Sequence, residues 1–174
     1  FDTAWGYHEG NSESVLGKLL SKYPRESYYL ATKFPGYDLS NMDQVESIFE
    51  KQLEKCRVDC FDFYMLHNVC ELNIEAYLDE KHGIMAYLKM QKAAGRIRRL
   101  GFSAHGSYEV MKRFLDKYST DMEFCQIQLN FLDWSFQGAK DKAKLLDDHH
   151  IPVWVMEPLR GGKLASLPEE HEAR

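Results

Sequence analysis

Segments that read as strands alternate regularly with segments that read as helices along the whole chain. The strand-like runs recur at intervals of roughly 25–35 residues, and a stretch with helical spacing of apolar residues separates each from the next. Such alternation is typical of parallel strands joined by crossover helices. The sequence therefore predicts an α/β architecture.

Six strands and five helices are predicted. The strands are expected at residues 1–4, 28–33, 61–67, 100–104, 124–129 and 152–156. The helices are expected at about residues 12–23, 42–56, 84–94, 108–118 and 138–149. On the first helix the expected apolar face consists of Val15, Leu16, Leu19 and Leu20, and on the second of Val45, Ile48, Phe49 and Leu53.

The strand count fits either a doubly wound sheet or a (β/α)8 barrel. A doubly wound sheet normally places GxGxxG directly after its first strand, and that pattern is absent. In a barrel, functional side chains lie at the carboxyl ends of several strands, as the polar residues of this chain do. We therefore predict a barrel. A full barrel takes about 250 residues, so 174 residues hold about six of the eight units.

Four polar residues close or directly follow the first three predicted strands: Asp2, Tyr7, Lys33 and His67. An ammonium beside a phenol favours the ionised phenolate and brings the phenolic proton within reach. Reduction of a carbonyl requires both a hydride and a proton donor. The four residues are therefore predicted to form a proton-transfer site at one rim of the sheet.

Composition narrows the partners and the compartment. The net charge of −5 indicates no general attraction to nucleic acid or anionic membranes, and the basic run at 96–99 is expected to be solvated in a turn. No apolar run approaches the length of a membrane span, and no signal peptide opens the chain. The cysteines lack a CxxC pair, which predicts reduced, buried thiols and a cytoplasmic location.

The opening residues DTAWGYHEGNSESVLG resemble the signature of the aldo-keto reductases, which reads roughly D-T-A-x-x-Y-G-x-G-x-x-E-x-x-L-G. The residues in register are Asp2, Tyr7, Gly10, Glu13, Leu16 and Gly17, and His8 replaces the usual glycine. Further similarity at 31–33, 62–67, 101–103, 126–133 and 157–162 extends the resemblance over essentially the whole chain.

This resemblance implies one barrel domain over residues 1–174, incomplete at both ends. It would run from the second barrel strand to just after the seventh, without the loop after the eighth strand that grips the cofactor's adenosine phosphate. The implied reaction is reduction of an aldehyde or ketone to an alcohol. The implied cofactor is NADP(H), with NAD(H) not excluded, and the implied partner is a small carbonyl or alcohol.

The resemblance also assigns catalytic roles. Tyr7 would be the general acid, and Lys33 would stabilise its ionised form. Asp2 would hold the lysine ammonium in place. His67 would donate a hydrogen bond to the substrate oxygen or pass a proton to Tyr7.

The expected cofactor-binding residues are Ser103, Gln126, Glu157, Pro158, Leu159, Arg160 and Gly161. Ser103 and Gln126 match positions that bind the nicotinamide carboxamide, whereas Ala104 replaces an asparagine common in the family and Glu157 stands where many members stack a tyrosine. The loop at 158–162 could approach the pyrophosphate through backbone N–H groups, with Arg160 as counter-charge, or could be a simple turn. The residues expected to line the mouth for substrate are Trp5, His8, Phe34, Asn68 and Trp134.

Two other classes of function stay open. In a metal-dependent barrel hydrolase, Asp2, His8, His67 and His105 would face one rim, but the sequence has no HxH or HExxH spacing and we expect no metal site. Alternatively, a nucleotide-binding barrel could act as a regulatory or interaction subunit, because related folds host different functions.

Overall fold

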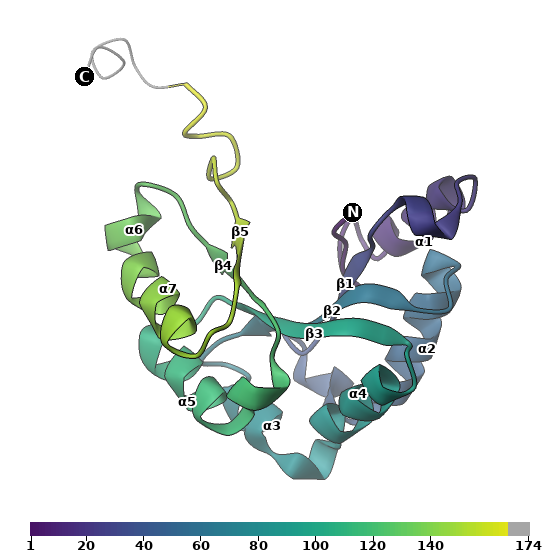
Figure 1. Ribbon diagram of the computed structural model, residues 1–174, viewed down its shortest axis with the longest axis horizontal. Helices are drawn as coiled ribbons and strands as arrows, with labels where there is room; N and C mark the ends of the chain where they lie inside the picture. The colour runs from purple at the N-terminus through teal and green to yellow at the C-terminus, as the bar shows by residue number, and fades with distance from the viewer. Residues whose placement is uncertain (167–174) are drawn as a thin grey trace.

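The computed structural model describes residues 1–166, which form a curved parallel sheet with helices along its outer side (Figure 1). The strands are β1 (Ala31–Phe34), β2 (Phe61–Val69), β3 (Ile97–Ala104), β4 (Cys125–Gln128) and β5 (Val153–Met156). They lie in the order β1-β2-β3-β4-β5, and each pairs in parallel with the next. This consecutive order is that of a partial (β/α)8 barrel wall, which confirms the predicted fold class.

Seven α-helices accompany the sheet in the described part of the chain: α1 (Ser12–Leu20), α2 (Val45–Cys56), α3 (Ile74–Leu78), α4 (Ile84–Ala93), α5 (Tyr108–Tyr118), α6 (Asp133–Phe136) and α7 (Ala139–Asp148). Short 3-10 turns lie at Arg25–Ser27, Leu39–Gln44, Glu80–His82 and Ser119–Asp121. All five predicted helices are present. The sequence reading missed α3 and α6, since five and four residues are too short to show helical periodicity.

The two faces of the sheet carry different cores. Side chains such as Tyr64 and Leu66 of β2 point outward and pack with the helices in the main core. The alternate residue Met65 points inward, as strand geometry requires. On this inner face the rings of Phe63, Phe124 and Trp154 pack with centroids 4.4–5.4 Å apart. These rings form an aromatic layer inside the curve of the sheet.

The buried face of α1 differs from the predicted one. Val15 and Leu19 are about half exposed, whereas Glu13 and Gly17 are buried together with Leu20. The reason is a close helix contact, because a Cβ at Gly17 would lie 2.2 Å from the carbonyl oxygen of Lys55 at the end of α2. The close contact at Gly17 sets where α1 packs, so only Leu16 and Leu20 of the predicted apolar face lie against the core.

The strand predicted at residues 1–4 is reduced to a single parallel bridge between Asp2 and Ala31. The bridge is supported by hydrogen bonds from Thr3 N to Ala31 O, at 2.9 Å, and from Ala31 N to Phe1 O, at 2.8 Å. Asp2 therefore still lies beside β1, at the edge of the sheet.

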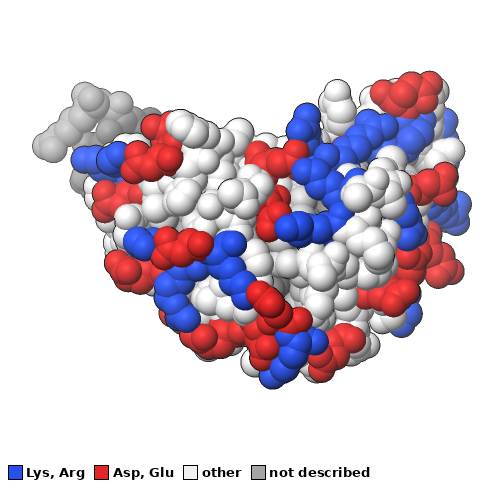
Figure 2. Space-filling model, turned by 60° about the horizontal axis from the view of Figure 1, so that its bottom comes forward, with Lys and Arg blue, Asp and Glu red and all other residues white. Residues whose placement is uncertain are grey.

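Basic and acidic side chains are interspersed over the helix-covered side shown in Figure 2. The basic run at 96–99 lies largely in β3 and not in a turn, and each arginine contacts a carboxylate: Arg96 with Glu50, Arg98 with Asp62 and Arg99 with Glu123. All four cysteines are free thiols; Cys56, Cys70 and Cys125 are buried as predicted, whereas Cys60 is only partly buried. No helix within residues 1–166 is long and apolar enough to cross a membrane.

Candidate active site

The ammonium of Lys33 lies at the carboxyl end of β1 with all three of its hydrogens directed at acceptors. Nζ donates to Asp2 Oδ1 at 2.6 Å, to the carbonyl oxygen of Thr3 at 2.9 Å and to the hydroxyl oxygen of Tyr7 at 3.4 Å. Lys33 is 1% exposed, whereas Tyr7 is 40% exposed. Because the phenol oxygen accepts from Lys33, the phenolic hydrogen is left to donate toward solvent or a bound molecule.

Asp2 connects Lys33 on β1 to a residue on β4. Its Oδ2 accepts a hydrogen bond from Gln126 Nε2 at 3.2 Å, while Oδ1 accepts from Lys33. Gln126 lies on β4, three strands away from β1. The aspartate therefore brings a predicted catalytic residue and a predicted cofactor-binding residue into one hydrogen-bonded group.

His67 lies in β2 with its ring edge-on to Tyr7, at a centroid distance of 5.9 Å. The side chain is buried, and Nδ1 has no hydrogen-bond partner in the described part of the chain. Burial, followed by the nearby charges of Lys33 and His105, lowers the pKa of His67 to about 3. The imidazole is therefore neutral near pH 7, which favours hydrogen bonding to a substrate oxygen over proton donation.

Tyr37 is a site residue that the sequence analysis missed. Its ring meets that of His67 edge-on at 5.2 Å, and a Cβ at Gly6 would lie 2.3 Å from the Tyr37 hydroxyl. Burial, then the carboxylates of Asp38 and Glu13, raise the pKa of Tyr37. The only sequence signal was an aromatic residue directly after the Pro35-Gly36 turn. Tyr37 forms a wall beside Tyr7, without the ammonium contact that Tyr7 has.

Two buried side chains in and before α3 hold the backbone of this rim. Tyr77 donates from its hydroxyl to the carbonyl oxygen of His67 at 2.9 Å. Asn73 donates from Nδ2 to the carbonyls of Gly36 and Asn68, at 3.0 and 2.8 Å. The loops after β1 and β2 are therefore fixed to each other, which holds His67 and its neighbours in place.

Ser103 and Gln126 both face the inner side of the sheet and both keep hydrogen-bonding capacity. The Asn68 N–H donates to Ser103 Oγ at 2.8 Å, so the serine hydroxyl retains its own proton as a donor. Gln126 uses an N–H on Asp2, and its carbonyl oxygen has no donor in the described residues. Ala104 instead packs in the outer core. One donor and one acceptor thus remain, which fits the complementary groups of a carboxamide.

The loop after β5 holds the other predicted cofactor residues, and its arginine is engaged. Arg160 Nε lies 3.8 Å from Oδ2 of the buried Asp133, and its guanidinium lies 5.3 Å from the centre of the Phe136 ring. Asn130 Nδ2 donates to the carbonyl oxygen of Glu157 at 3.0 Å. Glu157 has a positive φ of 55°, and the following residues form consecutive turns. The loop is therefore held by contacts with α6 and with Asn130, which precedes that helix.

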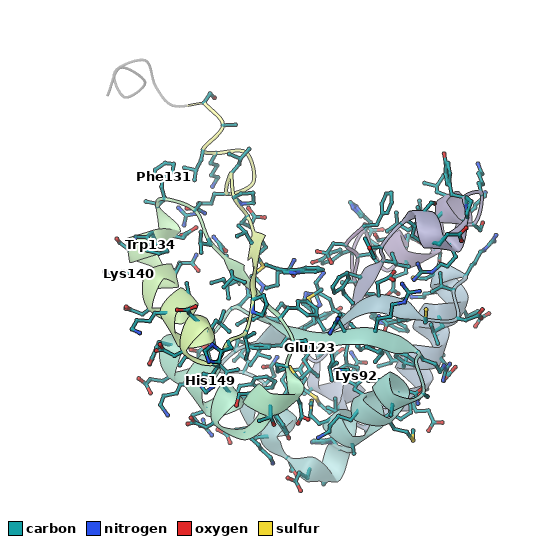
Figure 3. All side chains as sticks on the ribbon, in the orientation of Figure 1. Lys92, Glu123, Phe131, Trp134, Lys140 and His149 are labelled. Carbon is teal, nitrogen blue, oxygen red and sulfur yellow. The ribbon has the colours of Figure 1, made fainter. Side chains whose placement is uncertain are left out.

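The residues predicted to line the mouth are not all placed there. Phe34 is fully buried in the outer core against Tyr77, so the prediction of a mouth position for it was wrong: it follows Lys33 and points to the opposite face of β1. Trp5 packs against the core with Lys55 3.8 Å above its ring. Trp134 lies on α6, across the molecule from α1 (Figure 3).

His8 and Asn68 are the remaining predicted mouth residues. His8 is exposed in the loop after Tyr7 and has a φ of 51°, a conformation that glycine adopts without steric cost. Asn68, with a φ of 60°, directly follows His67 at the rim. Both therefore lie in segments that adjoin the four predicted catalytic residues.

Two features lie outside this site. Within residues 1–166, no three His, Cys, Asp or Glu side chains gather closely enough to hold a metal ion. A cleft of about 470 Å³ is lined by Tyr77, Ile84, Met85 and Tyr118, among others, and lies among the outer helices. It has no contact with Tyr7 or Lys33.

Comparison with known proteins matches a family model described as the aldo/keto reductase family to residues 1–173. An NADH-specific methylglyoxal reductase of Escherichia coli is 28% identical over 94% of this chain. The chain spans 53% of that relative's length.

Solved structures agree on the fold. An aldo-keto reductase of Bacillus halodurans in its holo form superposes with a TM-score of 0.73 at 26% identity, covering 97% of this chain and 55% of that one. An aldo-keto reductase from Klebsiella pneumoniae in complex with NADPH gives a TM-score of 0.67 at 21% identity, covering 94% of this chain and 54% of that one. The second likeness supports the fold alone.

Proposed function

Since this chain belongs to the aldo/keto reductase family, we propose that it reduces an aldehyde or ketone to an alcohol, with a nicotinamide dinucleotide as the source of hydride. Asp2, Tyr7, Lys33 and His67 are the proposed catalytic residues. The proposal concerns the activity of the whole protein. The residues proposed to transfer the proton all lie within the described part of the chain.

One observation carries this proposal: the Tyr7 hydroxyl accepts a hydrogen bond from Lys33 and still has its own proton to donate. The three acceptors around the Lys33 ammonium hold that group on the phenol oxygen. As the proton leaves, negative charge develops on the phenol oxygen, and the adjacent ammonium stabilises it. Tyr7 is also exposed enough to meet a substrate.

His67 has a complementary role in the proposal. A neutral imidazole at the rim donates one hydrogen bond and so orients a carbonyl oxygen between itself and Tyr7. His67 Nδ1 is buried and has no hydrogen-bond partner in residues 1–166, so this ring nitrogen keeps its capacity to bind a substrate. The low pKa of His67 keeps this role constant over the pH range in which proteins are usually assayed.

When bound, a reduced nicotinamide would be the source of the hydride that the carbonyl carbon receives. The residues of this chain that would hold its carboxamide are Ser103 through its hydroxyl proton and Gln126 through its carbonyl oxygen. Asp2 orients the Gln126 side chain by accepting from Nε2. The proposed contacts with the pyrophosphate are the backbone N–H groups of Leu159 and Gly161, in the loop that Glu157 and Pro158 begin directly after β5. Arg160 would contribute only by leaving Asp133.

NADP(H) was the expectation from sequence, and the relative from Escherichia coli bears the name of an NADH-specific enzyme. We therefore propose that either dinucleotide is accepted, because Ser103 and Gln126 would contact the nicotinamide end, which the two dinucleotides share. Methylglyoxal and other small aldehydes are the proposed first substrates. His8, Asn68 and Tyr37 would contact them.

Steady-state oxidation of NADH and of NADPH by the full-length protein, with a panel of aldehydes and ketones, tests the proposal. Turnover of at least one carbonyl, with alcohol formed in equal amount, is the expected result. Binding of the dinucleotide without turnover of any carbonyl would favour the regulatory-subunit alternative and would reject the enzyme.

A further inference from the structure

A second polar cluster is buried between α1, β1, α2 and β2, next to the backbone of Lys33. At its centre is Glu13, which is 0% exposed. Its Oε1 accepts from the Thr32 hydroxyl and from Gln52 Nε2, each at 2.7 Å. Its Oε2 faces Lys55 Nζ at 3.5 Å. A buried carboxylate loses a large hydration energy, so its retention without substrate contact calls for a reason.

The cluster contacts both the strand that carries Lys33 and the loop that carries Tyr7. Gln52 Nε2 also donates to the backbone carbonyl of Lys33 at 3.0 Å, which fixes the strand from which the ammonium extends. Lys55, the cation facing Glu13, lies 3.8 Å above the ring of Trp5, within the segment that runs from Asp2 to Tyr7. Glu13 therefore joins the backbone of Lys33 to the loop that carries Tyr7.

A second contact reinforces the same connection. The Thr3 hydroxyl donates to Ser12 Oγ at 2.8 Å, which ties the start of the loop to the start of α1. Thr3 also supplies the carbonyl oxygen that accepts from the Lys33 ammonium. The helix that carries Glu13 is thus fixed to the same short segment that holds Lys33 Nζ in place.

The chemistry of the cluster requires a carboxylate. Thr32 and Gln52 donate to Glu13 Oε1, whereas Oε2 faces the Lys55 ammonium as an ion pair and has no hydrogen-bond partner in the described residues. A carboxylate supplies both the acceptor for the two donors and the negative charge opposite the ammonium. A glutamine that keeps its oxygen on Thr32 and Gln52 would direct its NH2 group at the Lys55 ammonium. Rotation of the Gln52 amide would not compensate, because its carbonyl oxygen already accepts a hydrogen bond from the Tyr64 hydroxyl at 2.6 Å.

We propose that Glu13 is a positioning residue that sets the distance between the Lys33 ammonium and the Tyr7 hydroxyl. This inference rests on the proposed reductase function. Both groups are reached through the cluster and neither is touched by Glu13 itself. Loss of the Glu13 carboxylate should therefore impair proton donation by Tyr7 while leaving binding at Ser103 and Gln126 unchanged.

The test compares Glu13→Gln with a matched control, Asp62→Asn, in the full-length protein. Asp62 is also a buried carboxylate in contact with cations, but it lies at the other end of β2. Glu13→Gln is expected to lower kcat by about tenfold to a hundredfold, since small misplacements of reacting groups have effects of that size. The KM for the dinucleotide should not change, and the solvent deuterium isotope effect on kcat should rise.

Asp62→Asn should lose stability but keep the wild-type kcat and isotope effect. Thr32→Val, which removes one donor to Glu13 and preserves side-chain shape, should show the same changes as Glu13→Gln to a smaller degree and serves if Glu13→Gln does not fold. The inference is overturned if Glu13→Gln or Thr32→Val alters only stability, as Asp62→Asn does. A wild-type protein without turnover would instead reject the proposed function.

Discussion

The two ends of the sheet each hold an aspartate in contact with cationic side chains, and the two groups differ in what they leave free. At the amino end, Asp62 contacts Arg25 at 2.6 Å and Arg98 at 2.8 Å and accepts from the Leu30 N–H at 2.8 Å. Its side chain is 2% exposed. At the carboxyl end, the side chain of Asp2 is 41% exposed and pairs with a single ammonium.

The difference lies in the kind of group that has no partner. At the amino end, Arg25 Nε and Asp62 Oδ1 are buried without a hydrogen-bond partner in the described residues, although Asp62 Oδ1 lies 2.8 Å from Arg98 Nη1. Arg25 reaches the carbonyls of Tyr28 and Cys60 in addition to Asp62, so the amino-end cluster ties backbone segments together.

At the carboxyl end, His67 Nδ1 has no partner in the described residues. The Tyr7 and Ser103 hydroxyl oxygens accept from Lys33 and from the Asn68 N–H, so each hydroxyl keeps its own proton as a donor. We therefore propose that similar ion pairs serve stability at the amino end and proton transfer at the carboxyl end. Four experiments test this contrast.

Lys33→Met should have the largest effect, a loss of about 10³-fold in kcat, because the phenol oxygen loses the cation that stabilises its ionised form. The exposed Asp2 can then be hydrated, so the fold should persist. Steady-state kinetics and thermal unfolding measure the two effects. Arg25→Met is the control at the other end and should reverse the pattern, with stability lost and kcat retained.

Asp62→Asn should lower the free energy of unfolding by about 3 kcal/mol, because two guanidinium groups lose their buried counter-charge. Both arginines are partly exposed, which limits the loss. Urea unfolding monitored by fluorescence measures it. A fall in kcat at full folding would contradict the separation of the two ends.

His67 should make the protein acid-sensitive. Its pKa is about 3 in the folded chain and about 6.5 in an unfolded one. The unfolded chain therefore binds more protons between these values, and the free energy of unfolding should fall as the pH falls below about 6.5.

From pH 6.5 to 5 the expected contribution of His67 is about 2 kcal/mol. Urea unfolding of the wild type and of His67→Gln at several pH values isolates this contribution by difference. Equal pH dependence of the two proteins would show that the imidazole is not buried in its neutral form.

Gln126→Met should have the smallest effect. It removes one acceptor for a carboxamide and one hydrogen bond to Asp2, and a single hydrogen bond contributes about 1 kcal/mol. The Kd for the dinucleotide should rise by roughly fivefold, with the stability almost unchanged. Fluorescence titration measures the Kd. An unchanged Kd would exclude Gln126 from the cofactor site.

Much of this arrangement could be predicted from the sequence. Periodicity located the five helices and the strands after residue 30, because parallel strands buried on both faces read as apolar runs. The grouping of Asp2, Tyr7, Lys33 and His67 followed from their positions at strand ends. The five-residue helix α3, which holds the backbone of His67 and Asn68, was too short for periodicity to reveal.

Side-chain direction was the main source of error. Phe34 is adjacent to Lys33 in sequence but points to the opposite face of β1, so proximity along the chain misassigned it to the mouth. Tyr37 reaches the site only because the Pro35-Gly36 turn brings it back over His67. Glu13 and Gln52 are residue types that usually face solvent, and only the fold shows that they meet.

The central claim is that Tyr7 donates the proton under the control of Lys33. The most direct measurement is kcat for Tyr7→Phe in the full-length protein, with dinucleotide affinity measured on the same preparation. The expected result is a loss of at least about 10³-fold in kcat, with the Kd for the dinucleotide close to that of the wild type. A Tyr7→Phe protein that keeps most of its kcat would contradict the assignment.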